Sequence, residues 1–146
     1  MKIYVLGSNA FMHKMVEVTD ELMAIGKDAF IAEHYRELVA GKRREQTDLW
    51  ALGSSERAKV KRDNDYFKMH YKHILESDAV LFVNDTKRGI ENYIGGNVLI
   101  EMGQAYVNNK KIYFLNAMPS VESGLTYLDE IIAMDPICLK GDLNKI

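Results

Sequence analysis

The segment Asp78–Asp85 limits the possible folds of this chain more than any other segment. Five of its residues, Ala79 to Val83, are consecutively apolar. A strand of this composition is typical of a parallel sheet that is covered on both faces. Parallel strands are joined by long crossover connections, most often helices, so we expect helices before and after this segment.

Strand-like and helical patterns do alternate along the chain. Strands are predicted at residues 2–6, 28–32, 78–85, 111–115 and 136–139. Helices are predicted at residues 12–25, 65–76, 97–109 and 122–134, with Gly26 ending the first and Asn97 capping the third. The order predicts an α/β fold, a Rossmann-like, three-layer open parallel sheet of about five strands with helices on both faces.

The length and the charges define the class of protein. A chain of 146 residues has the length of one domain, 1–146, and the charged stretch at about 36–64 reads as an insertion or lid. Nineteen basic and 21 acidic residues leave a net charge of −2, so we expect neither nucleic acid nor a membrane as partner. No apolar run approaches the roughly 20 residues of a membrane helix, and the N-terminus lacks the pattern of a signal peptide. We therefore expect a cytoplasmic protein.

Metal and thiol chemistry find little support in the sequence. His70 and His73 have the spacing of a helical metal-binding pair, but no third ligand stands at a suitable distance along the chain. Cys138 is the single cysteine and lies in an apolar segment, which favours a place in the core. We therefore expect no metal and no cofactor, and His70 could instead line a site, since its helix leads into the central strand.

The carboxyl ends of the predicted strands nominate the rim of a ligand site. In open parallel sheets, ligands bind outside these ends. The residues that follow the strands are Gly7-Ser8-Asn9, Glu33-His34, Asn84-Asp85 and Asn116-Ala117.

The segment Gly95-Gly96-Asn97 precedes a predicted helix that carries Glu101. Two glycines allow a backbone to approach a ligand closely, and the helix start offers unpaired N–H groups. Glu101 lies about one turn inside this helix, where its carboxylate could stabilise or attack a developing cation. Asp85 could supply the second carboxylate that glycosidic chemistry uses. A solvated glutamate and a turn-forming aspartate are the structural alternatives.

Three stretches together resemble the nucleoside 2-deoxyribosyltransferase-like superfamily, which includes the 2'-deoxynucleoside 5'-phosphate N-hydrolases. They are Ser77–Val83, Glu101-Met102-Gly103-Gln104-Ala105 and Lys110–Leu115, with the glycine-bearing loop between the first two. The family pattern is an "aDvv" strand, a glycine loop, "E-x-G-x-A" and a "K-x-I" strand. Gly7-Ser8 and Glu33-His34 add weaker matches.

The resemblance implies cleavage or transfer at the N-glycosidic bond of a (deoxy)nucleoside or its 5'-monophosphate. Glu101 matches the nucleophile of the family, and by its position Asp85 is the candidate that protonates the leaving base. The family also builds its sites with a neighbouring subunit, so the resemblance implies a homodimer or higher homo-oligomer, with the turn at 116–119 as the place of contact. The expected substrate-binding residues are Gly7, Ser8, Asn9, His34, Gly95, Gly96, Asn97 and Asn116.

Two positions depart from the family pattern. Ala10 stands where the monophosphate hydrolases carry a phosphate-binding arginine, for which Lys14 or Arg88 could substitute. Gly95 stands where the transferases carry an aspartate, six residues before the nucleophile. The choice between hydrolase and transferase therefore stays open. A non-catalytic nucleotide-binding domain on the same fold and a hydrolase of the nicotinamide–ribose bond are the alternatives.

Overall fold

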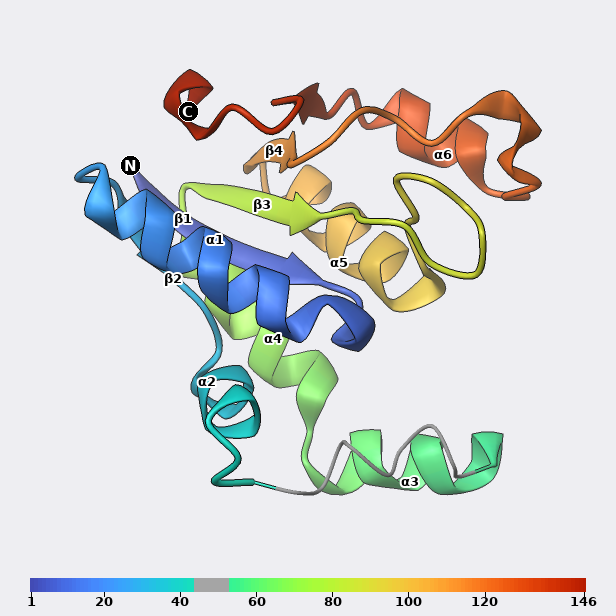
Figure 1. Cartoon of the computed structure of the whole chain (residues 1–146). Coiled ribbons are helices and arrows are strands. Elements are labelled where there is room, and N and C mark those ends of the chain that lie inside the picture. Colours follow the sequence, from blue (N-terminus) through green and yellow to red (C-terminus); the bar gives the residue numbers. More distant parts are fainter. Residues whose placement is uncertain (44–52) are drawn as a thin grey trace.

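A five-stranded, all-parallel sheet forms the centre of the protein (Figure 1). The computed structural model describes residues 1–43 and 53–146. The order of the strands is β2-β1-β3-β4-β5, and each neighbouring pair is parallel. Their bounds are β1 (Lys2–Gly7), β2 (Asp28–Phe30), β3 (Ala79–Val83), β4 (Lys111–Phe114) and β5 (Ile137–Cys138).

Helices cover both faces of this sheet, which confirms the predicted three-layer, Rossmann-like α/β fold. Figure 1 shows α1 on one face, while α4 and α5 pack together on the other. The helices are α1 (Met12–Ala24), α2 (Glu33–Val39), α3 (Ser54–Asp63), α4 (Tyr66–Leu75), α5 (Gly96–Val107) and α6 (Leu128–Ala133). In the described part of the chain, no helix combines the length and the apolar character needed to cross a membrane.

The central strand is β3, as its composition predicts. Its five residues are all buried, and Leu81 lies in register with Val5 of β1 and Tyr113 of β4. Burial of apolar side chains on both faces of β3 supplies the main driving force for placing helices above and below it.

Glycines set two details of the fold. Gly26 has a φ of +82°, and it follows α1 where a left-handed residue ends a helix, as predicted. Gly7 ends β1 where the chain passes close to its neighbours. A Cβ at this position would lie 2.9 Å from the Val83 carbonyl oxygen and 3.0 Å from Met15 Sδ.

Two predicted helix boundaries are wrong. Asn97 does not cap α5, because Gly95 takes the extended cap conformation and its carbonyl accepts the amide of Leu99 at 3.0 Å. The helix predicted at 122–134 is interrupted by Gly124, whose φ is +75°. A 3-10 turn, η3 (Val121–Ser123), precedes this glycine, and α6 begins four residues after it at Leu128.

The insertion or lid predicted at about 36–64 falls partly outside the described residues, namely at 44–52. Its described parts are the end of α2 and the whole of α3, and α3 buries none of its side chains. The division of the chain into one domain with such an insertion stays a prediction.

We predict that Gly7→Ala lowers the free energy of unfolding by about 1–3 kcal/mol, because the new methyl group would overlap a backbone oxygen that cannot move freely. Gly103→Ala is the matched control. Gly103 lies inside α5 with open space around a Cβ, and the change should raise stability by up to about 1 kcal/mol. Urea unfolding of both variants measures this, and equal effects would contradict the close approach at Gly7.

Candidate functional site

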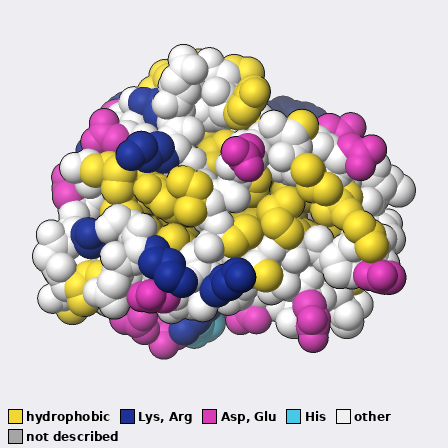
Figure 2. Space-filling model, turned by 90° about the horizontal axis from the view of Figure 1, so that it is seen from above, with side chains coloured by type: hydrophobic (Ala, Val, Ile, Leu, Met, Phe, Trp, Pro, Cys, Tyr) yellow, Lys and Arg dark blue, Asp and Glu magenta, His cyan; other side chains and the backbone are white. Residues whose placement is uncertain are grey.

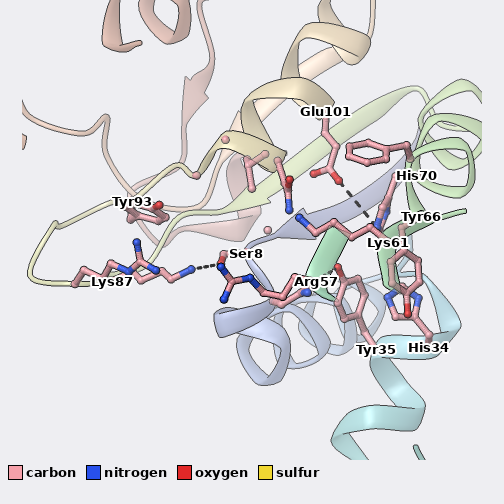
Figure 3. A pocket seen from close by; sticks show the side chains of 18 residues that line it. Ser8, His34, Tyr35, Arg57, Lys61, Tyr66, His70, Lys87, Tyr93 and Glu101 are labelled. Atoms are coloured by element: carbon pink, nitrogen blue, oxygen red, sulfur yellow. Dashed lines mark hydrogen bonds and ion pairs between the residues drawn. The ribbon is translucent and has the colours of Figure 1, made fainter. Parts of the chain in front are cut away.

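A cavity of about 310 Å³ opens where β1 and β3 end. The chain leaves β1 toward α1 on one face and leaves β3 toward α5 on the other, so the two connections diverge at this point. Such a switch point is where open parallel sheets bind ligands. The walls come from the loop after β1, from α2, α3 and α4, from the segment 87–97 and from α5 (Figure 3).

Glu101 projects into this cavity from the second turn of α5. Its side chain is nearly buried, and the whole residue is 9% exposed. Burial raises the pKa of its carboxyl to about 8, against an opposing effect of the Lys61 ammonium. The protonated form of Glu101 is therefore favoured at pH 7.

His70 of α4 also lines the cavity, and its ring faces Glu101 (Figure 3). Its Nε2 lies 4.0 Å from Glu101 Oε1, and its Nδ1 lies 2.7 Å from the hydroxyl of Tyr4. Burial lowers the pKa of His70 to about 3, with smaller contributions from His34 and His73. The ring is therefore neutral at physiological pH.

An aromatic wall lies beside this pair, and it consists of His34, Tyr35 and Tyr66. The rings of His34 and Tyr66 are stacked, with centroids 5.1 Å apart and an interplanar angle of 22°. The ring of Tyr35 also packs against His34, with centroids 4.1 Å apart, and the Tyr35 hydroxyl donates to Asn9 Oδ1 at 2.9 Å. Burial, Arg43 and His73 lower the pKa of His34 to about 4, so the His34 ring is uncharged near neutral pH.

A polar and cationic wall includes Ser8 and Lys87 (Figure 3). Lys87 Nζ donates to Ser8 Oγ at 3.0 Å and lies 5.3 Å from the centroid of the Tyr93 ring. Ser8 Oγ also accepts the amide of Ala10 at the start of a 3-10 turn, η1 (Asn9–Phe11). Burial and the neighbouring Arg88 lower the pKa of Lys87. Arg57, Lys61 and Arg88 also line the cavity, which gives it a net positive character.

Most of the predicted site residues come together in this cavity. Besides Glu101, the candidate substrate-binding residues that line it are Gly7, Ser8, Asn9, His34, Gly95, Gly96 and Asn97. His70, weighed in the sequence as a residue that could line a site, also lines it, as does Tyr93.

Asp85 and Asn116 do not reach the cavity. Asp85 is exposed, and its Oδ1 accepts the amide of Thr86 at 2.7 Å, as a turn-forming aspartate does. Asn116 forms two hydrogen bonds with Asn84. Its backbone N–H donates to Asn84 Oδ1 at 2.9 Å, and its side-chain Nδ2 donates to the Asn84 carbonyl at 3.0 Å. Glu101 is thus the one carboxylate among the described residues that line the cavity, and the predicted pair of carboxylates does not form there.

Several residues of the cavity carry no signal that the sequence analysis used. They are Tyr35, Arg57, Lys61, Tyr66, Phe67, Lys87 and Val98. Arg57 and Lys61 are four residues apart on α3, and Tyr66 and His70 have the same spacing on α4. This spacing places each pair on one helix face, but only the packing shows that both faces look into the cavity.

No cluster of three or more His, Cys, Asp or Glu side chains suited to a metal ion occurs in residues 1–43 and 53–146. Of the two proposed substitutes for the phosphate-binding arginine, Arg88 lines the cavity. Lys14 lies elsewhere and pairs with Glu17 at 3.2 Å.

Comparisons with models of protein families, with curated proteins and with solved structures gave no match to this chain.

We predict that Glu101→Gln stabilises the protein, and increasingly so as the pH rises. Between pH 4.5 and about 8 the unfolded chain loses the Glu101 proton while the folded protein keeps it, so folding becomes less favourable with pH in this window. Gln has no proton to lose. The gain should be near zero below pH 4.5 and on the order of 1–3 kcal/mol at pH 7.

Thermal unfolding of wild type and variant from pH 4 to pH 8.5 measures this gap. Glu21→Gln, on the exposed side of α1, is the control and should show no comparable growth of the gap. A Glu101→Gln effect that is constant over the whole range would contradict the predicted protonation of Glu101.

Proposed function

We propose that this protein cleaves or transfers at the N-glycosidic bond of a (deoxy)nucleoside or nucleoside 5'-monophosphate, with Glu101 as the nucleophile. The observation that carries the proposal is the position of Glu101. It is a buried carboxyl, held by a helix at the switch point of a parallel sheet, in a cavity with aromatic and cationic walls.

The chemistry proposed for Glu101 follows from the charge of the reaction. When the bond between the anomeric carbon and the base nitrogen breaks, its electron pair leaves with the base and the sugar becomes cation-like. A carboxylate oxygen then bonds to the anomeric carbon and forms a glycosyl ester. Water restores the carboxylate in hydrolysis, and a second base does so in transfer. An anion in a site of low dielectric stabilises such a transition state strongly.

The walls of the cavity support a nucleotide-like substrate. The rings of His34, Tyr35 and Tyr66 offer surface for contact with a base. Ser8, Lys87 and Arg88 offer a hydroxyl and two cations to a 5'-phosphate. A volume of about 310 Å³ is at the small end for ligand cavities and favours a mononucleotide over a dinucleotide such as NAD. The proposal assigns no role to Asp85.

A non-catalytic nucleotide-binding domain is the second candidate. The raised pKa of Glu101 favours it, because a neutral carboxyl is no nucleophile. The absence of a second carboxylate among the described lining residues also favours it. The two candidates differ in whether the base is released.

A homo-oligomer in the cytoplasm is part of the same proposal. Figure 2 shows apolar side chains on the surface between groups of charged ones. Large apolar residues are also exposed along α4 and α5, where Phe67, Tyr71 and Leu75 recur every four residues and Ile100 and Val107 lie on α5. Such faces favour contact with another copy of the chain.

We predict that the purified protein releases free base from at least one member of a panel of ribo- and deoxyribonucleosides, their 5'-monophosphates and NAD. Glu101→Gln should reduce the rate by at least about 10³-fold while binding persists, since the amide cannot form the glycosyl ester. Chromatography of the products measures the release. Thermal stabilisation by one compound without release would favour the binding domain, and release unaffected by Glu101→Gln would remove Glu101 from the mechanism.

We further predict that Lys87→Met raises KM for a nucleoside 5'-monophosphate about tenfold, because a charge-assisted contact to phosphate is lost. The KM for the corresponding nucleoside should stay nearly unchanged. Lys14→Met is the matched control, because Lys14 lies on the surface of α1 outside the cavity. Steady-state kinetics with both substrates measure this. Equal increases for nucleoside and monophosphate would contradict a phosphate contact at Lys87.

A further inference from the structure

We propose that Tyr4 and His70 are positioning residues for Glu101. The Tyr4 hydroxyl donates to His70 Nδ1, which places the proton of the ring on Nε2 and directs this N–H at the Glu101 carboxylate. The inference rests on the proposed role of Glu101 as a nucleophile.

The first step of the argument is the hydrogen bond between Tyr4 and His70. Tyr4 Oη and His70 Nδ1 are 2.7 Å apart, a short contact between two buried side chains. Within the described residues, the Tyr4 hydroxyl has no other hydrogen-bond partner. If His70 carried its proton on Nδ1, the Tyr4 O–H would be buried without an acceptor, which costs free energy. The geometry therefore favours the tautomer with Nε2–H.

The second step is the rigidity of the pair. Tyr4 is fully buried on β1, where its ring stacks on Phe30 at 4.9 Å and contacts His73 at 5.2 Å. Burial raises the pKa of Tyr4 well above its ordinary value, so the phenol keeps the proton that it donates. His70 is 7% exposed and lies on α4, which packs directly against α5. Three separate elements, β1, α4 and α5, thus hold the hydroxyl, the ring and the carboxyl.

The third step is the distance of 4.0 Å between His70 Nε2 and Glu101 Oε1. This distance is too long for a hydrogen bond. Burial favours the protonated form of Glu101, so the N–H has no anion to approach. When Glu101 ionises, the two groups attract one another and a small movement of either side chain closes the contact. One carboxylate oxygen is then held by His70, and the other is left to bond to the anomeric carbon.

Other charged and titratable groups also surround the pair. His34 and Tyr35 of α2 lie 6.0 and 6.2 Å from the His70 ring, and Tyr66 of α4 lies at 6.4 Å. His73 of α4 lowers the pKa of His70, and Lys61 of α3 lowers that of Glu101. Among these groups, Lys61 is the one whose charge favours ionised Glu101, so its effect must be separated from that of His70. Lys61→Met serves this purpose.

The direct test is the tautomer of His70, read by nitrogen NMR of protein labelled in its histidines. We expect neutral His70 with its proton on Nε2 throughout the range from pH 6 to pH 8. Tyr4→Phe should convert this state into a mixture of both tautomers, whereas Lys61→Met should leave it unchanged. A proton on Nδ1 in the wild type, or no effect of Tyr4→Phe, would overturn the proposal. This readout does not depend on turnover.

Kinetics with the substrate found in the base-release experiment test the functional part. Tyr4→Phe and His70→Leu should lower kcat about 10- to 100-fold with little change in KM, because a hydrogen bond to a charged group is lost. Both should shift the rising limb of the pH profile to higher pH. His70→Gln keeps an N–H donor at a similar reach and should recover most of the rate. In the His70→Gln background, Tyr4→Phe should have little further effect, since the tautomer no longer matters.

Thermal unfolding of each variant shows that it is folded. Additive losses of kcat for Tyr4→Phe and His70→Gln, or equal losses for His70→Gln and His70→Leu, would indicate a merely structural role and overturn the proposal. If no substrate releases its base, the proposed function fails while the NMR result still decides the tautomer. A carbon NMR titration of Glu101 then replaces the kinetics. An unchanged Glu101 pKa in Tyr4→Phe would contradict the positioning role proposed for Tyr4 and His70.

Discussion

Burial of β3 on both faces is the constraint on which the rest of this structure depends. A strand with five buried residues requires cover above and below, and the chain supplies it with α1 on one face and α4 with α5 on the other. The connections that follow β1 and β3 must then diverge, and the cavity lies where they do. The helix that covers β3 also carries Glu101, so the requirement for a covered sheet and the position of the carboxyl have the same origin.

Two electrostatic effects in the cavity shift the pKa of Glu101 in opposite directions. Burial disfavours its charged form, and Lys61 is the neighbour that favours it. His70 does not contribute a charge, because burial and two other histidines keep it neutral. The site therefore resembles neither a buried ion pair nor a solvated carboxylate. It is a pair of neutral groups, in which His70 would donate to a charged acceptor only when the carboxyl ionises.

The sequence predicts the fold well because its signals are local. Continuous apolar residues identify β3, and alternation of strands with helices identifies the sheet. It also places Glu101 near the strand ends, because a residue early in a helix that follows a strand lies there in any such fold.

The sequence does not predict the direction of the side chains in the loops. Asp85 and Asn116 follow strands as predicted, but both are engaged outside the cavity. Asp85 accepts the amide of the next residue, Thr86, and Asn116 donates to Asn84, which follows the neighbouring strand β3. Lys61 and Tyr66 enter the cavity through the packing of α3 and α4, which no local pattern encodes.

The raised pKa of Glu101 links the stability of the protein to the reaction proposed for it. An environment that keeps the carboxyl neutral gives little attraction to a neutral sugar in the ground state. The same low dielectric strengthens the interaction once the anomeric carbon becomes cation-like, because water does not screen it. Stabilisation would then be largest in the transition state, and this differential is what accelerates a reaction. A cation-like anomeric carbon favours the ionised form of Glu101, whereas a phosphate near Glu101 disfavours it, because the phosphate is a second anion. The cations on the wall with Ser8 and Lys87 would therefore serve two purposes for a 5'-monophosphate: they attract the phosphate, and they shield Glu101 from its charge.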